Sequence, residues 1–396
     1  MSERNLRDLL GDAAADIPAF APAPEVAVRR ARRRAALSVG TACLALLLAV
    51  LVAVPIASSL AGLSEETPAS GSVIDIYPIG GQALPMATVA AYGSVWTLEQ
   101  SAMGEGMGWN TELVGRHIDG GDEWVRRSLG QDAGGQWVQL RAGFGAIWAL
   151  SPTREDLIKV DPATGQIAWR HQVPARGFDI GSGGVWTIGF TGDAMKYGTL
   201  DPQAVNVVPV GKTPIGIASA WDTVWVVDDF DGTVRRIDAI TEEVTAKIRT
   251  GVNLTGDIAA DGRGAYTIGC RALDGSRDTR VELDACELVL ITIDPSTNTV
   301  ARMTPLAGSS TTAMGPAHWA FVESVDSSGV WVVVSEAACA RSPFAPCDGD
   351  VLLRFAHDGA SLLERIDGME VTDATSADGD LWIADAAGNE IVRWRP

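Results

Sequence analysis

Carboxylates at equivalent positions of a repeated pattern are the residues of this sequence that point most directly to chemistry. Seven short β-prone segments each precede an aromatic residue, and their matching positions carry Thr88, Gln139, Asp179, Gly216, Asp257, Glu323 and Asp373. We call this set the channel ring. Four of its seven members are carboxylates, which repel one another when they are close, and a bound cation or proton relieves that repulsion. The pattern predicts a site for Ca²⁺, Mg²⁺ or a basic group; the alternative is ordinary acidic lining of a water-filled channel.

The elements that must position this ring follow from an aromatic residue that recurs at intervals of 38 to 65 residues. It is preceded by a small or β-branched residue and occurs at Trp96, Trp148, Trp186, Trp225, Tyr266, Trp331 and Trp382. Units of about 40 residues with four short strands are typical of β-propeller blades. We therefore expect seven blades, with these aromatic side chains in the core between blades.

The fourth repeat shows the four strands most clearly, at 214–218, 224–227, 233–238 and 244–248. The last repeat has only three strand-like segments before the chain ends at Pro396. The alternating segment Ser72–Tyr77 supplies the missing fourth strand and would close the ring, which removes an exposed sheet edge. The sequence thus predicts an all-β fold in which residues 72–396 form a seven-bladed β-propeller.

Residues 213–218 (TPIGIA), 224–226 (VWV) and 232–238 (GTVRRID) resemble the seven-bladed propellers of the streptogramin B lyase and YVTN-repeat type. The resemblance covers residues 72–396. The lyases use inner-strand histidines with an acid and a magnesium ion, but only His318 lies near the start of an inner strand here. The resemblance therefore transfers no catalytic residue, and it describes the fold better than the function.

The segment before the propeller predicts a membrane anchor. Residues 35–63 carry no charge, and an apolar run of about 20 residues spans a bilayer as a helix. Five arginines lie just before it, at positions 29–34, which places the N-terminus in the cytoplasm and the propeller outside. We expect a largely disordered leader at 1–35, a transmembrane helix at 36–60 and a linker at 61–71; a cleaved signal peptide is the alternative.

Charge is distributed unevenly along the 396 residues. The formal net charge is −19 in total, while residues 1–35 hold seven arginines and five acids. The propeller segment therefore carries a large negative charge, which excludes nucleic acid as a partner because phosphate contacts require a basic surface.

Four cysteines fall in the predicted propeller, and four cysteines allow three pairings. The local pairing Cys270–Cys286 and Cys339–Cys347 would staple the loops between the second and third strands of blades five and six. Export places these residues where disulfides persist. A metal site is the rival interpretation, although no short C-x-x-C motif is present.

Long loops accompany the same strands, at 99–109, 270–286 and 335–350. Such loops on a rigid scaffold commonly carry recognition. We expect a monomeric, membrane-anchored module that binds or senses an extracytoplasmic ligand or envelope protein, with no certain cofactor. An exported lyase or hydrolase is the alternative.

Overall fold

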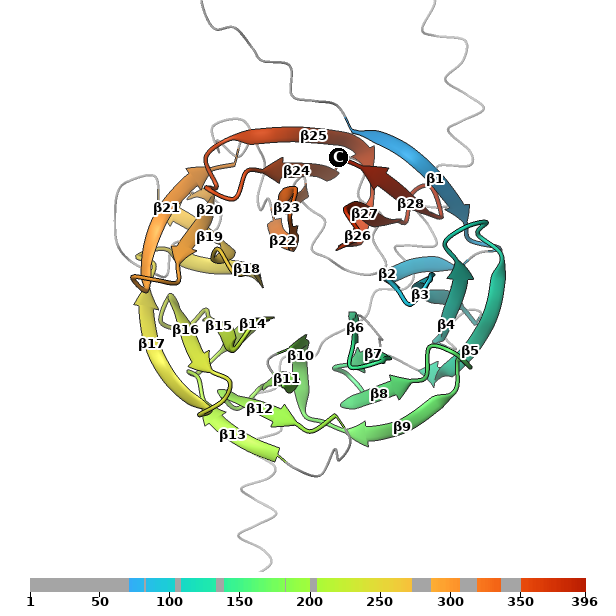
Figure 1. The fold of residues 1–396 in the computed structure, drawn as a ribbon, viewed down its shortest axis with the longest axis horizontal. Coiled ribbons are helices and arrows are strands. Elements are labelled where there is room, and N and C mark those ends of the chain that lie inside the picture. The colour runs from blue at the N-terminus through green and yellow to red at the C-terminus, as the bar shows by residue number, and fades with distance from the viewer. Residues whose placement is uncertain are drawn as a thin grey trace, which may run out of the picture. The chain divides into compact units, whose positions relative to one another are not determined.

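Seven four-stranded antiparallel sheets surround one central axis in the computed structural model (Figure 1). The structure describes residues 71–81, 83–103, 108–132, 139–181, 183–199, 205–272, 286–306, 319–335 and 350–396. The predicted seven-bladed β-propeller is confirmed. Blade one consists of β2–β5, blades two to six each take the next four strands, and blade seven combines β26–β28 with β1.

The strands occupy four concentric positions in each blade. The innermost strands are β2 (Leu84–Ala91), β6 (Gln139–Gly143), β10 (Ala175–Gly181), β14 (Pro214–Ala220), β18 (Asn253–Ala260), β22 (Trp319–Asp326) and β26 (Val371–Ala377). The second strands are β3 (Ser94–Ala102), β7 (Ala146–Ser151), β11 (Gly184–Gly189), β15 (Thr223–Asp228), β19 (Ala265–Ala272), β23 (Gly329–Ser335) and β27 (Asp380–Asp385).

The outer half of each blade is built in the same way. The third strands are β4 (Trp109–His117), β8 (Asp156–Val160), β12 (Asp193–Tyr197), β16 (Thr233–Asp238), β20 (Cys286–Asp294), β24 (Asp350–Phe355) and β28 (Glu390–Arg395). The outermost strands are β5 (Glu123–Asp132), β9 (Ile167–Gln172), β13 (Val205–Pro209), β17 (Glu243–Arg249), β21 (Thr299–Pro305), β25 (Leu362–Met369) and β1 (Ser72–Pro78). The first predicted long loop is shorter than expected, because β3 continues to Ala102.

The N-terminal strand closes the ring, as predicted. β1 pairs antiparallel with β28, from Ser72 opposite Arg395 to Pro78 opposite Glu390. In Figure 1 the blue strand β1 completes the red seventh blade. Tyr77 from β1 is buried and its ring centroid lies 5.6 Å from that of Trp382. Blade seven is therefore assembled from both ends of the propeller segment.

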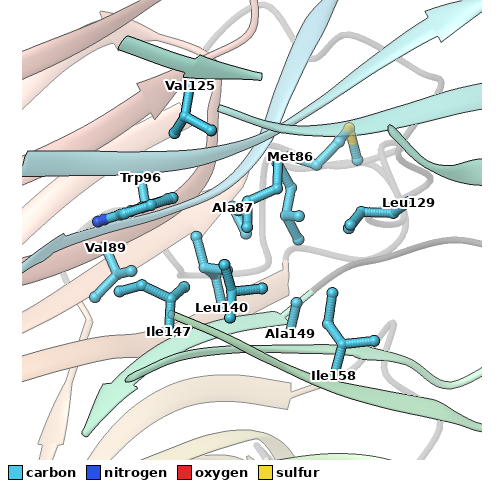
Figure 2. Close-up of a cluster of buried hydrophobic side chains, with 13 residues drawn as sticks. Met86, Ala87, Val89, Trp96, Val125, Leu129, Leu140, Ile147, Ala149 and Ile158 are labelled. Atoms are coloured by element: carbon cyan, nitrogen blue, oxygen red, sulfur yellow. The ribbon is translucent and has the colours of Figure 1, made fainter. Parts of the chain in front are cut away.

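The recurrent aromatic residue lies in the core of every blade. All seven side chains are at most 2% exposed, and each occurs on the second strand. Figure 2 shows one such core, in which Trp96 of blade one packs with Leu140 and Ile147 of blade two. The predicted inter-blade role of these residues is confirmed, and burial removes them as a ligand platform.

A cation on the third strand accompanies the tryptophan in several blades. In blade three, Lys196 lies 5.4 Å from the Trp186 ring and donates to the carbonyl of Ala239 in blade four. In blade four, Arg236 lies 5.4 Å from Trp225 and donates to Pro295 in blade five. The repeated pair thus links neighbouring blades, in addition to apolar burial.

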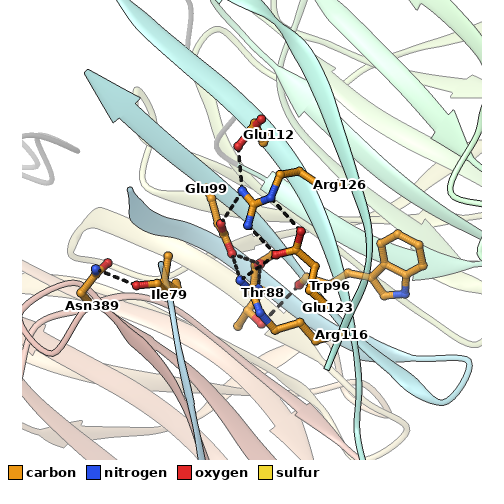
Figure 3. Close-up of polar contacts among 10 residues, drawn as sticks. Ile79, Thr88, Trp96, Glu99, Glu112, Arg116, Glu123, Arg126 and Asn389 are labelled. Atoms are coloured by element: carbon orange, nitrogen blue, oxygen red, sulfur yellow. Dashed lines mark hydrogen bonds and ion pairs between the residues drawn. The ribbon is translucent and has the colours of Figure 1, made fainter. Parts of the chain in front are cut away.

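A buried ionic network occupies blade one (Figure 3). Glu99 is 1% exposed, and its Oε1 lies 2.5 Å from Nη2 of Arg116, which is 4% exposed. Nη1 of Arg126 lies 3.0 Å from Glu99 Oε2 and 2.7 Å from Glu112 Oε2. Strand alternation places Glu99 on the same face as Val95, which packs against Trp382 of blade seven. The network therefore lies on the face of blade one that meets the closing blade.

The closing blade should respond to acid through Asp380. This carboxylate is 2% exposed, and hydrogen bonds from Arg395 and Arg393 hold its pKa below the usual value. A lowered folded-state pKa stabilises the fold above the ordinary carboxyl pKa near 4, and this contribution is lost as the pH falls through the lowered value. We expect Asp380→Asn to lower the free energy of unfolding by about 2 kcal/mol at pH 7.

Denaturant unfolding at pH 7 and pH 3 measures this effect. The difference between wild type and Asp380→Asn should shrink at pH 3. The control Asp367→Asn removes an exposed carboxylate, paired with Arg365 on β25, and should change stability little at either pH. A difference for Asp380→Asn that is the same at both pH values would contradict the assignment.

Residues 1–70 lie outside the described part of the chain, and so do the predicted leader, transmembrane helix and linker up to that point. No helix with the length and apolar character of a membrane span occurs among the described residues. Anchoring and export therefore stay predictions.

Candidate functional site

The seven innermost strands surround the central axis, and neighbouring innermost strands contact one another around the ring (Figure 1). Register shifts interrupt several of them, for example between Val371 and Asp373 in β26. Such bulges insert unpaired residues and re-aim side chains. The exact placement of the channel ring therefore depends on these irregularities.

Strand pairing puts the members of the channel ring at different levels. Gln139, Gly216 and Asp373 each pair with the residue two positions after the tryptophan of their own blade. Asp179 pairs with the tryptophan itself, and Thr88 with the residue directly after it. Positions that match in the sequence therefore differ in register by one or two residues.

The two remaining ring members, Asp257 and Glu323, lie at such irregularities themselves. Asp257 and Glu323 lie inside bulges of β18 and β22, and both side chains are half-buried. Thr88 is fully buried, and its Oγ1 lies 3.4 Å from the carbonyl oxygen of Trp96. Its side chain thus belongs to the interior of the blade and does not face the axis.

Several ring side chains accept hydrogen bonds from the backbone of the next blade. Gln139 Oε1 accepts from the N–H of Phe178 at 3.0 Å. Asp179 Oδ2 accepts from Ser219 at 2.5 Å, and Asp373 Oδ2 accepts from Thr88 at 2.7 Å across the closing seam. The inner edge of each sheet has no further strand to pair with, so these side chains satisfy amides that would otherwise lack a protein partner.

Arg141 is a charged residue of the site that was not predicted from the sequence. It follows Gln139 by two positions on β6, so both side chains lie on the same face of that strand. Its Nε lies 3.5 Å from Asp179 Oδ1, and its Nη1 donates to the carbonyl of Leu140 at 2.9 Å. The sequence signal that could have predicted its role is its spacing, two positions after the ring member Gln139.

The four carboxylates of the channel ring all interact electrostatically with Arg141. Burial lowers the pKa of its guanidinium, but the carboxylates at Asp179, Asp373, Asp257 and Glu323 together raise it above the ordinary value. All four acidic members of the channel ring therefore act on one guanidinium. They are contributed by four different blades, so the propeller closure is what brings them together.

Asp179 forms an ion pair with this cation. Burial raises its pKa above the usual value, and Arg141 and the amide of Ser219 oppose that rise. Both side chains still have solvent contact, at 34% exposed for Arg141 and 18% for Asp179. Four carboxylates and one guanidinium leave a formal charge of −3 when all are ionised, so the ring still attracts cations.

Gly216 shows how tightly the ring is built in blade four. A Cβ atom at this position would lie 2.8 Å from Asp257 Oδ1. The absence of a side chain lets the innermost strands β14 and β18 approach one another. Blade four therefore contributes backbone where other blades contribute a polar side chain.

The geometry favours an organic cation over a metal ion. Among the described residues, no three His, Cys, Asp or Glu side chains lie close enough to hold a metal ion together. Ca²⁺ takes six to eight oxygen ligands, and Mg²⁺ requires near-octahedral geometry. The described ring residues therefore do not form a Ca²⁺ site of several carboxylates, whereas a guanidinium or ammonium group needs only nearby carboxylates.

The histidines relevant to an enzyme lie elsewhere or outside the described part. His318 belongs to the undescribed residues. His117 ends a third strand, His171 lies on an outermost strand, and His357 lies in a turn with its Nε2 2.5 Å from the carbonyl oxygen of Asp326. None of these three is on an innermost strand.

The cysteines are described only in part. Cys270 is buried on β19 and disulfide-bonded. The side chain of Cys286, and all of Cys339 and Cys347, lie outside the described residues. The local pairing Cys270–Cys286 and Cys339–Cys347 therefore stays a prediction.

Comparisons with known proteins define the fold class. No protein-family model and no curated protein matches the sequence. A chain of hydrazine synthase from Kuenenia stuttgartiensis is similar with TM-score 0.56 and 11% identity, over 86% of this chain and 99% of that one. U3-55K has TM-score 0.56 and 9% identity, over 82% and 98%. The Pan2 WD40 domain from Neurospora crassa has TM-score 0.51 and 9% identity, over 83% and 94%.

These similarities show a β-propeller and nothing finer. Their identities are too low to transfer an activity, and a fold shared by proteins this different does not imply one function. The function must be argued from the site.

Proposed function

We propose that this chain is a membrane-anchored, exported binding module whose channel ring receives a basic side chain of a protein or peptide partner. The membrane-spanning segment is the uncharged stretch at 36–60, with the arginine cluster at 29–34 on the cytoplasmic side. The propeller then faces the extracytoplasmic space.

The observation that supports the ligand class is Arg141 and its four carboxylates. The guanidinium occupies the position that a ligand's lysine or arginine would take, and four blades direct negative charge toward it. The residual formal charge of −3 leaves capacity for a second cation. The strongly acidic composition of the chain adds long-range attraction for a basic partner.

Fluorescence anisotropy with a labelled tetralysine peptide tests this proposal. The full-length protein is placed in phosphatidylcholine nanodiscs, which do not themselves attract the peptide. We expect the Asp257→Asn/Glu323→Gln double variant to bind at least tenfold more weakly, a loss of about 1.4 kcal/mol. Affinity should also fall as salt rises, because the ring remains accessible to solvent.

A matched control separates the ring from the overall charge. The Asp75→Asn/Asp367→Asn variant removes two carboxylates from the outermost strands β1 and β25. Its affinity should stay within about twofold of wild type, since distant surface charges are screened. Equal losses in the two double variants would show that tetralysine binds the surface at large, which would contradict a ring site.

Anchoring has its own test. In intact cells, a tag before residue 1 should resist external protease, whereas a tag after residue 396 should be removed. Release of the propeller without the N-terminal tag would indicate the cleaved signal peptide instead. The three described histidines do not support the lyase or hydrolase alternative, because none of them lies on an innermost strand.

A further inference from the structure

One end of the propeller carries exposed aromatic side chains in unusual positions. The inner turns, which join the innermost strand of a blade to its second strand, all lie at this end, which we call the turn face. Tyr92, Phe144 and Trp221 occupy the inner turns of blades one, two and four and are 49%, 46% and 80% exposed. Ile240, 75% exposed, lies at the same end, because it follows Ala239, whose N–H donates to the carbonyl of Asp222 in the inner turn of blade four.

The backbone at these turns does not favour aromatic residues. Their φ angles are +55° for Tyr92, +51° for Phe144 and +56° for Trp221, in the left-handed region that bulky residues rarely adopt. In blade seven the matching position is Asp378, with φ of +53°. Asp, Asn or Gly fits such a turn at lower cost, so the fold itself does not explain three aromatic residues.

The described chain begins at this same end. Ser72 pairs with Arg395, and the neighbouring residue Trp394 pairs with Leu381, directly after the inner turn of blade seven. Gly71 donates its N–H to Glu364 there at 2.7 Å. Gly71, where the described chain begins, therefore lies at the turn face.

We propose that the turn face lies against the lipid headgroups of the membrane, with Trp221, Tyr92 and Phe144 as interfacial contacts. This inference rests on the proposed anchor at 36–60. Trp and Tyr are enriched at the membrane–water interface, because one part of each ring system is apolar and another is polar. The linker at 61–71 would reach at most about 40 Å when fully extended.

A short linker between the anchor and the propeller allows a small number of contacts to hold the turn face at the membrane. A short linker gives a tethered domain an effective concentration in the millimolar range, so weak aromatic contacts hold the face at the surface. Carboxylates at the same end, such as Asp222 and Asp261, limit the depth of insertion and disfavour anionic lipid. We therefore expect shallow contact with zwitterionic headgroups.

Quenching of tryptophan emission by headgroup-attached nitroxide lipid tests the orientation. The full-length protein is measured in phosphatidylcholine nanodiscs, with and without the nitroxide. We expect Trp221→Asn to lose at least half of the quenching that wild type shows, and the Tyr92→Asn/Phe144→Asn/Trp221→Asn variant to lose nearly all of it. Asn accepts the left-handed turn, so these variants keep the fold.

The control Trp169→Phe removes a tryptophan from the outermost strand β9 and should leave the quenching unchanged. Exchanging part of the lipid for phosphatidylglycerol should reduce quenching of wild type. Equal quenching of wild type and Trp221→Asn in protein that has entered the nanodiscs would overturn the orientation alone. Failure of the full-length protein to enter nanodiscs would overturn both the anchor and the orientation.

Discussion

Replacing Tyr77 by alanine is expected to lower the free energy of unfolding by about 3–5 kcal/mol, the usual range for removing a large buried aromatic side chain. Tyr77 is only 4% exposed, and it packs against Trp382 from the other end of the propeller segment. Its hydroxyl donates to the carbonyl of Ile118 at 2.7 Å, which links the closing blade to blade one. Equilibrium unfolding in guanidinium chloride measures the change.

Two companion variants show whether closure is responsible. Tyr77→Phe keeps the ring and loses the hydrogen bond, so we expect a cost of about 1 kcal/mol. Ile76→Ala lies next to it on β1 but is 51% exposed, and it should cost much less than Tyr77→Ala. Equal effects of Ile76→Ala and Tyr77→Ala would indicate that β1 does not close the ring.

The second large effect is expected at Glu99. Glu99→Gln leaves the guanidinium of Arg116, only 4% exposed, without its carboxylate at 2.5 Å. Removing one partner of a buried ion pair costs about 3–5 kcal/mol, and the carboxylate that Arg116 keeps, Glu123, is partly exposed and lies farther away, at 3.8 Å. Arg126 also pairs with Glu112 and Glu123 (Figure 3), and replacing Glu99 leaves these two partners in place, so the loss falls mainly on Arg116.

The double variant Glu99→Leu/Arg116→Met gives the decisive comparison. Replacing both partners by apolar residues of similar size leaves no buried charge unpaired, so we expect it to be clearly more stable than Glu99→Gln. Chemical denaturation of both variants and wild type measures the order. A double variant that is less stable than Glu99→Gln would contradict this expectation. It would show that the ion pair adds net stability to the seam, beyond offsetting the cost of burying its two charges.

Sequence patterns were sufficient for the fold because each blade repeats the same physical requirement. The second strand of each blade carries a buried aromatic residue, for example Trp148, Trp225 and Trp331. The spacing of these residues along the chain indicated a propeller. The segment Ser72–Tyr77 was recognisable as the closing strand because it alternates and the last repeat lacks one strand.

The site was less predictable, because strand register decides where a side chain points. A bulge between Val322 and Ser324 shifts Glu323, and Thr88 turns into its blade instead of facing the axis. Bulges follow from packing around a closed ring, which the local sequence of one strand does not reveal. Arg141 was not predicted, because it lies two residues beyond the aligned position Gln139. Only the closed ring brings carboxylates from four blades close to it.

The cation-π pairs were missed for a similar reason. Lys196 and Arg236 face the tryptophan of the neighbouring strand, so the relevant spacing runs across the sheet and not along the chain. The backbone carbonyls that accept hydrogen bonds from these two cations lie in the next blade. Such contacts appear only when the register of two strands and the angle between two blades are both known.

Binding of labelled tetralysine to Arg141→Gln is the measurement that tests the central claim most directly. Removing the internal guanidinium changes the formal charge of the ring from −3 to −4 and vacates the position that a basic side chain would occupy, so we expect affinity to rise about three- to tenfold. Arg141→Lys keeps the charge and should bind as wild type does. Arg365→Gln makes the same change in net charge on the outermost strand β25 and should bind within about twofold of wild type. An Arg141→Gln protein that is folded and binds tetralysine no more tightly than Arg365→Gln would contradict the proposal that the channel ring receives basic groups.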